Sequence, residues 1–154
     1  MDSLRTGTKS ESLLKQEFNI TGGDFVNAGE SSIKIRNTLR DIGIDSDIIR
    51  RIAIAAYEAE MNVVMYAERG IMRIDVYRDK ILLAIDDKGP GIQDLDLAMQ
   101  PGYSTATEEM REMGFGAGMG LPNIKKNADT FKITSEVGKG TKLEIRILLD
   151  GKND

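Results

Sequence analysis

The stretch from Asp87 to Leu121 reads DKGPGIQDLDLAMQPGYSTATEEMREMGFGAGMGL, and its glycines decide how the rest of the chain is interpreted. Loops of this length inside a compact domain are usually functional or disordered. Residues 93–115 contain few large apolar side chains and many polar ones. We therefore expect this part of the stretch to be mobile until a ligand orders it.

The end of the stretch, Gly114 to Leu121, places glycines at alternate positions directly before a predicted helix. Backbone amides in such a run are free to wrap phosphate groups, and a helix N-terminus favours anions. A dinucleotide-binding fingerprint would need a strand just before the glycines, whereas the segment TATEEMREM is polar. No Gly-Lys-Ser/Thr sequence follows, which excludes a Walker A loop. A phosphate-binding loop and a flexible linker are the two interpretations left.

The beginning of the stretch places Asp87 at the end of a predicted strand, followed by Gly89 and Gly91. A carboxylate there can accept a hydrogen bond from the exocyclic amine of adenine, and the glycines let the backbone approach the ring. A turn that needs glycine for its backbone angles is the alternative. Thr141, in GKGT before the last predicted strand, is a weaker candidate to support the adenine through Asp87 or a water.

Upstream, the segment EAEMN places Glu58 and Asn62 four residues apart on one face of a predicted helix. An Asn amide oxygen is a suitable ligand for Mg²⁺. A carboxylate one turn away can take a proton from an attacking hydroxyl or water. Two solvated surface residues are the alternative. Glu60 lies on another face, so replacing it with Gln is expected to matter little.

Outward from these segments, capping residues and apolar spacing predict the remaining elements. Asp24 and Asp45 are expected to cap two helices, and Gly43 and Gly70 are expected to close them. Helices are predicted over residues 25–42, 46–68 and 121–129, and strands at residues 18–20, 72–77, 81–87 and 143–149, with one more strand beginning at residues 131–133.

These elements predict an α+β fold: a two-layer α/β sandwich with a mixed, mostly antiparallel sheet and helices on one face. Residues 1–16 are expected to form a flexible N-terminal arm. Residues 17–150 are expected to form one domain.

Composition excludes several kinds of chemistry. The 154 residues include no cysteine and no histidine, so disulfides, thiolate or histidine metal sites and phosphorylation on histidine are ruled out. The formal net charge of −4 gives no basic field to attract nucleic acid. No apolar run approaches the roughly 20 residues of a membrane helix, and no secretory signal is visible. A cytoplasmic protein is expected.

Taken in order, the four segments resemble the N, G1, G2 and G3 boxes of the GHKL ATPase superfamily, over about residues 18–149. Within that superfamily the chain is similar to the small serine kinases of bacterial partner-switching systems, the anti-sigma factors and the related switch kinase. The likeness rests on the Glu-x-x-x-Asn box, the PGYST segment and the run GAGMGLPNIKKNAD. The resemblance implies the Bergerat ATP-binding fold.

The resemblance also implies roles for individual residues. Glu58 would be the catalytic base, Asn62 would hold Mg²⁺ and Asp87 would hold adenine. The other residues expected at the nucleotide are Gly89, Gly91, Ile92, Gly116, Ala117, Gly118, Met119, Gly120, Leu121 and Thr141. The chain departs from the pattern at the lid arginine: Arg111 lies several residues too early, which leaves its role open. Lys125 and Lys126 are expected on a solvated helix face.

The implied function is an ATP- and Mg²⁺-dependent kinase that phosphorylates a serine of a STAS-like antagonist protein, with a sigma factor or other regulator as a possible further partner. The alternative is an ATP-dependent regulatory binding module with little or no transfer. A simple ATP hydrolase or a histidine-kinase fragment is a third, less favoured interpretation. The protein is expected to be a monomer or homodimer with no nucleic-acid or membrane partner.

Overall fold

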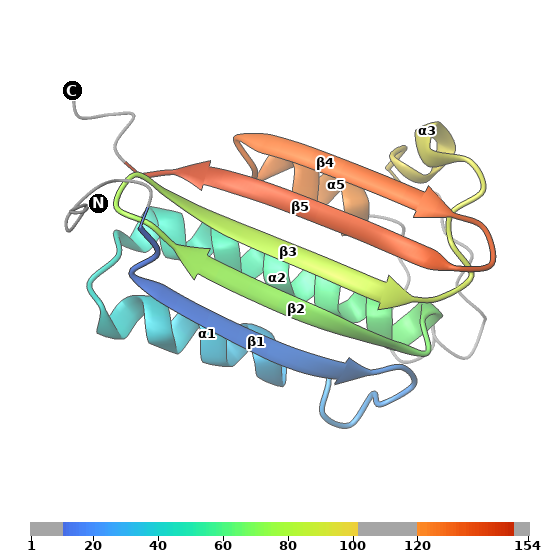
Figure 1. The fold of residues 1–154 in the computed structure, drawn as a ribbon, viewed down its shortest axis with the longest axis horizontal. Helices are drawn as coiled ribbons and strands as arrows, with labels where there is room; N and C mark the ends of the chain where they lie inside the picture. Colours follow the sequence, from blue (N-terminus) through green and yellow to red (C-terminus); the bar gives the residue numbers. More distant parts are fainter. Residues whose placement is uncertain (1–10, 102–119, 150–154) are drawn as a thin grey trace.

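A five-stranded sheet with helices on one of its faces makes up the part of the chain that the computed structural model describes, residues 11–101 and 120–149 (Figure 1). The helices are α1 (Glu30–Asp41), α2 (Ser46–Tyr66), α3 (Leu95–Ala98) and α5 (Gly120–Lys126). The strands are β1 (Leu14–Thr21), β2 (Arg69–Val76), β3 (Lys80–Lys88), β4 (Thr130–Glu136) and β5 (Gly140–Leu148). The α+β class and the single helical layer confirm the prediction.

The strand order is β1-β2-β3-β5-β4, and every neighbouring pair among the described strands is antiparallel. The prediction of a mixed sheet was therefore wrong. β4 does run parallel to β3, but β5 folds back from β4 and lies between them, so the two parallel strands never pair. The alternation of side chains predicted the strands but not this insertion.

The core lies between α2 and the sheet. Asp45 caps α2 as predicted, because its side chain accepts a hydrogen bond from the Asp47 amide at 3.2 Å. The inward side chains of the three central strands alternate with exposed or half-buried ones. The fully buried ones include Met72, Ile81, Ile145 and Ile147. Burying each such side chain stabilises the fold by about 1.5–3 kcal/mol. Among the described helices, none is long and apolar enough to cross a membrane.

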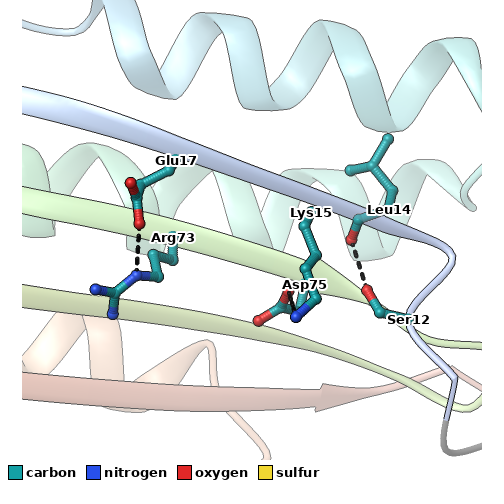
Figure 2. Close-up of polar contacts among 6 residues, drawn as sticks. All are labelled: Ser12, Leu14, Lys15, Glu17, Arg73 and Asp75. Atoms are coloured by element: carbon teal, nitrogen blue, oxygen red, sulfur yellow. Dashed lines mark hydrogen bonds and ion pairs between the residues drawn. The ribbon is translucent and has the colours of Figure 1, made fainter.

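The first strand begins earlier than predicted. β1 starts at Leu14 and pairs with β2 along its whole length, so the predicted arm to residue 16 was wrong for its last three residues. Figure 2 shows Glu17 bound to Arg73 Nε at 2.8 Å and Lys15 beside Asp75 at 4.0 Å. Such exposed pairs are worth about 0.2–1 kcal/mol each. The backbone ladder, rather than these charges, holds the strand.

The first helix is shorter than predicted. Its N-cap is Gly29, whereas Asp24 lies in a turn and accepts hydrogen bonds from the backbone and side chain of Asn27. The other end agrees with the prediction: Gly43 has φ +86°, and the amides of Gly43 and Ile44 bind the carbonyls of Arg40 and Leu39. This is the Schellman arrangement that ends a helix.

Gly70 does not close the second helix. α2 ends at Tyr66, and Gly70 lies inside β2 opposite Asp87. A Cβ built at Gly70 would lie 2.9 Å from a Val63 methyl, so the strand passes α2 at a distance that only glycine allows. Gly70 therefore allows close packing of β2 against α2 and is not a helix cap.

Candidate functional site

Glu58 and Asn62 lie on the face of α2 that packs against the first turn of α5. A Cβ built on Gly120, the first residue of α5, would lie 3.3 Å from Asn62 Oδ1 and 3.5 Å from Glu58 Oε1. Both side chains are half-buried. The amide oxygen and the carboxylate therefore meet at the backbone that follows the glycine run, with no side chain between them and Gly120.

A polar side chain of α5 also binds Glu58. Asn123 Nδ2 donates a hydrogen bond to Glu58 Oε2 at 3.2 Å. The sequence interpretation missed this residue, because its role depends on how α5 docks on α2. Its position one turn after Gly120 in a short predicted helix is the only signal that the sequence offers.

Asp87 lies near the end of β3, between β2 and β5. Its Oδ1 accepts a hydrogen bond from the Thr141 amide at 3.1 Å. Burial raises the pKa of Asp87 above its ordinary value of 3.8, the Thr141 hydrogen bond lowers it, and the charge of Asp86 raises it. Only Oδ1 of the carboxylate is in a hydrogen bond among the described residues, so Oδ2 can accept from a ligand amine.

Ser135, also missed from the sequence, joins the loop after Asp87 to β5. Its hydroxyl accepts a hydrogen bond from the Ile92 amide at 2.7 Å and lies 2.8 Å from the Thr141 hydroxyl. It also lies 3.2 Å from the carbonyl oxygen of Gly140. Ile92 and Thr141 are thus placed beside each other by one serine, and Thr141 is buried.

Two glycines allow this loop and the β4–β5 turn to touch. Gly140 has φ +147°, and a Cβ there would overlap the carbonyl oxygen of Asp87. Gly91 has φ +77°, and a Cβ there would overlap the carbonyl oxygen of Glu136. Any other residue at either position would strain the backbone and push the loop away from β5.

The two groups of residues lie at different points along α2. Glu58 and Asn62 face α5, whereas a Cβ built on Gly89 would lie 3.1 Å from the backbone of Ala67, just past the end of the helix. Five residues separate Asn62 from Ala67, which corresponds to about 7.5 Å along a helix axis. An elongated ligand with a polar ring at one end and charged groups at the other would fit this spacing.

Glu60 lies on another face of α2 from Glu58, as predicted. It is buried, with 2% of its surface exposed, and it caps the start of α1. Oε2 accepts from the Gly29 amide at 3.0 Å and the Ser31 amide at 3.4 Å, and Oε1 accepts from the Ser32 amide at 3.0 Å and hydroxyl at 2.6 Å. The sequence interpretation did not anticipate this buried cap, which gives Glu60 a structural role. That Glu60→Gln matters little for turnover stays a prediction.

Several predicted residues lie outside the described part of the chain: Arg111, Gly116, Ala117, Gly118 and Met119. Leu121 lies in α5, partly buried against the core. Lys125 and Lys126 are exposed, as predicted. In the described residues no three acidic side chains come together as a metal site. The assignment of Asn62 as a magnesium ligand stays a prediction.

Comparison with known proteins gives a family for this arrangement. Residues 32–147 match the family described as the histidine kinase-like ATPase domain. A serine/threonine-protein kinase, RsbT of Bacillus subtilis, is 31% identical over 113 residues, which cover 71% of this chain and 79% of that protein. An anti-sigma F factor of Clostridium beijerinckii is 32% identical and covers 65% of this chain and 71% of the relative.

A solved structure shares the fold. The crystal structure of the RsbU and RsbW domains of a Mycobacterium tuberculosis protein superposes with a TM-score of 0.56 at 17% identity. The match covers 86% of this chain, which spans only 32% of that larger protein. At this identity the likeness shows the arrangement of strands and helices and nothing about activity.

Proposed function

Because the chain belongs to the histidine kinase-like ATPase domain family, we propose that it is an ATP-dependent protein serine/threonine kinase of a bacterial partner-switching system. It would transfer the γ-phosphate of ATP to a serine of a small STAS-like antagonist protein. The names of two relatives, a serine/threonine-protein kinase and an anti-sigma F factor, support this class of activity. A sigma factor or another regulator is a candidate second partner.

The observation that carries the proposal is the meeting of Glu58 and Asn62 at Gly120. A kinase needs a proton acceptor beside the transferred phosphate and a group that positions the metal–phosphate unit. The carboxylate and the amide oxygen supply these two groups from adjacent turns of one helix. Asp87, near the end of β3 and beside the last turns of the same helix, supplies an acceptor for the adenine amine.

In the proposed reaction, the serine oxygen of the antagonist bonds to the γ-phosphorus of ATP. The bond between that phosphorus and the β–γ bridging oxygen breaks, and ADP leaves. Glu58 accepts the proton that the serine hydroxyl loses. Both oxygens of Glu58 lie at α5, so the carboxylate is held where the phosphate end of the nucleotide would lie.

The donor set around Asn62 suits Mg²⁺. This ion prefers oxygen ligands, keeps several waters and is commonly held by one or two protein groups together with substrate phosphates. Asn62 offers one amide oxygen, and Gly120 beside it has no side chain to crowd an ion. When bound, the ion neutralises charge on the phosphates, and Asn62 would fix its position relative to Glu58.

The competing proposal is a module that binds a regulator when ATP is bound and transfers phosphate poorly. Such a role would need an exposed apolar surface, and the described residues include the exposed apolar side chains Val26, Ile33 and Tyr57, which are 93%, 49% and 42% exposed. Tyr57 lies against Gly29 and immediately precedes Glu58 in the chain. The two proposals differ in whether the parent protein transfers phosphate, with Glu58 as the base, or only binds ATP and its partner.

Glu58→Gln tests the kinase proposal. We expect unchanged ATP affinity and a loss of about 10²–10⁴-fold in phosphate transfer, or in slow ATP hydrolysis where no antagonist is supplied. Asn62→Ala should weaken Mg²⁺-dependent ATP binding as well. Glu144→Gln is the matched control, since Glu144 is exposed in β5 and should keep full activity. Full activity in Glu58→Gln would remove Glu58 as the base, whereas a parent that binds ATP but transfers no phosphate would favour the binding module.

A further inference from the structure

The carboxylate of Glu58 is held from one side by a residue with no role so far. Asn123 Nδ2 lies 3.2 Å from Glu58 Oε2, while Glu58 Oε1 faces Gly120. A carboxylate only accepts hydrogen bonds, so Asn123 must present its NH₂ group to it. The contact fixes the last torsion of a side chain that would otherwise sample several rotamers.

The helix that carries Asn123 is itself held in place by several contacts. Its neighbour Ile124 is fully buried, which fixes the backbone of α5 against the core. The Asn127 side chain donates to the Asn123 carbonyl at 2.8 Å, and Arg51 of α2 donates to the Asn127 carbonyl at 3.0 Å. The short helix is therefore tied to α2 at its far end as well as through Glu58.

The far end of α5 is also tied to the sheet. Arg51 binds Asp129 at 3.1 Å, and the other oxygen of Asp129 accepts from the Leu148 amide of β5 at 2.7 Å. A side chain mounted on such an anchored helix can orient a partner with little movement of its own. This is how precise catalytic geometry is usually supported.

We propose that Asn123 is a positioning residue for Glu58, holding the carboxylate so that its second oxygen faces Gly120 and the neighbouring Asn62. The inference rests on the proposed kinase function and adds to it a residue that acts through the base. Positioning matters because proton transfer requires the base within hydrogen-bond reach of the hydroxyl it deprotonates. Nucleotide binding does not need this orientation and should be insensitive to it.

The test compares kcat, KM and ATP affinity for variants at this position. Asn123→Ala should lower kcat about tenfold and leave ATP affinity within about twofold, since the lost contact is one hydrogen bond to a charged group. Asn123→Asp should lose at least as much, because a second carboxylate cannot donate and repels Glu58. Asn123→Gln keeps a donor and should retain activity to within about threefold of the parent.

Lys126→Ala is the matched control. Lys126 lies on the same helix with an exposed side chain, so this variant should leave kcat unchanged. In the Glu58→Gln background, Asn123→Ala should cause no further loss, since residues that act as a unit are not additive.

The outcomes separate the two proposals. An active parent whose kcat is unchanged by Asn123→Ala overturns the positioning role alone. A further tenfold loss in the Glu58→Gln background overturns it too, because Asn123 would then act apart from Glu58. A parent that turns over no ATP with any antagonist overturns the kinase function, and the positioning role with it.

Discussion

Replacing Glu60 by Gln should destabilise the protein without touching its chemistry. The carboxylate is buried and receives four donors from residues 29–32, at the start of α1. Glu60→Gln keeps the shape of the side chain but replaces one accepting oxygen with an NH₂ group. It also removes a negative charge from a helix N-terminus, where such a charge is favourable.

The magnitude follows from where the new NH₂ group would point. Facing Gly29 and Ser31, it would oppose two amide donors that cannot turn away. Facing Ser32, it would oppose one amide, while the Ser32 hydroxyl can rotate and accept from it. The second arrangement costs less: one hydrogen bond to a charged group, about 1.5–3 kcal/mol, and the charge at the helix end, about 0.3–1 kcal/mol. We expect a loss of about 2–4 kcal/mol.

Urea unfolding and thermal melting measure this loss. For a domain of this size, about 2–4 kcal/mol corresponds to a melting temperature lower by roughly 5–15 °C. Glu30→Gln is the matched control, because Glu30 is an exposed acid in the first turn of the same helix and should cost only the helix-end charge, about 0.3–1 kcal/mol. Equal stability of the two variants would refute the buried cap. Turnover well below the melting transition should be unchanged in both.

Two further predictions concern Asp87. ATP should bind more tightly than GTP, by roughly 5- to 150-fold, because guanine presents a carbonyl where adenine presents an amine and leaves the carboxylate facing another acceptor; titration of both nucleotides with Mg²⁺ tests this, and equal affinities would remove the assignment. The pKa of Asp87 is raised by burial above 3.8, so the folded state binds more protons and the stability from this group is lost as pH rises from below 3.8 through the raised pKa. The Asn side chain of Asp87→Asn does not titrate. Urea unfolding at a series of pH values should therefore show the parent losing stability relative to the variant as pH rises through that window. A difference in unfolding free energy that does not change with pH would contradict this.

The sequence predicted most of the elements, because each is specified locally. Alternation marked β5, whose inward side chains Leu143, Ile145 and Ile147 are buried. Asp45 marked the start of α2 through its side-chain hydrogen bond, and Gly43 marked the end of α1 through its backbone amide. The order of the strands depends on pairing between distant segments, which no local pattern encodes. This is why the antiparallel insertion of β5 was not predicted.

The polar contacts of the site were predicted unevenly for the same reason. Asp87 was identified because a carboxylate at a strand end is visible in the sequence. Ser135 and Asn123 act through elements that meet only in the fold. Glu60 did carry a signal that the interpretation passed over: it lies four residues after Ala56 and three before Val63, on the buried stripe of α2. An acid on such a stripe is buried and needs donors.

The contrast between Glu58 and Glu60 supports the choice of base on grounds independent of any relative. At 3.6 residues per turn, two residues differ by about 200° around a helix, so one acid faces α5 and the other faces α1. A carboxylate offers about four acceptor positions. Glu60 fills them with four described donors, and taking a proton would break one of those bonds. Glu58 receives one described donor, from Asn123, and is half-exposed. It keeps acceptor positions for a proton from substrate, which is what a general base requires.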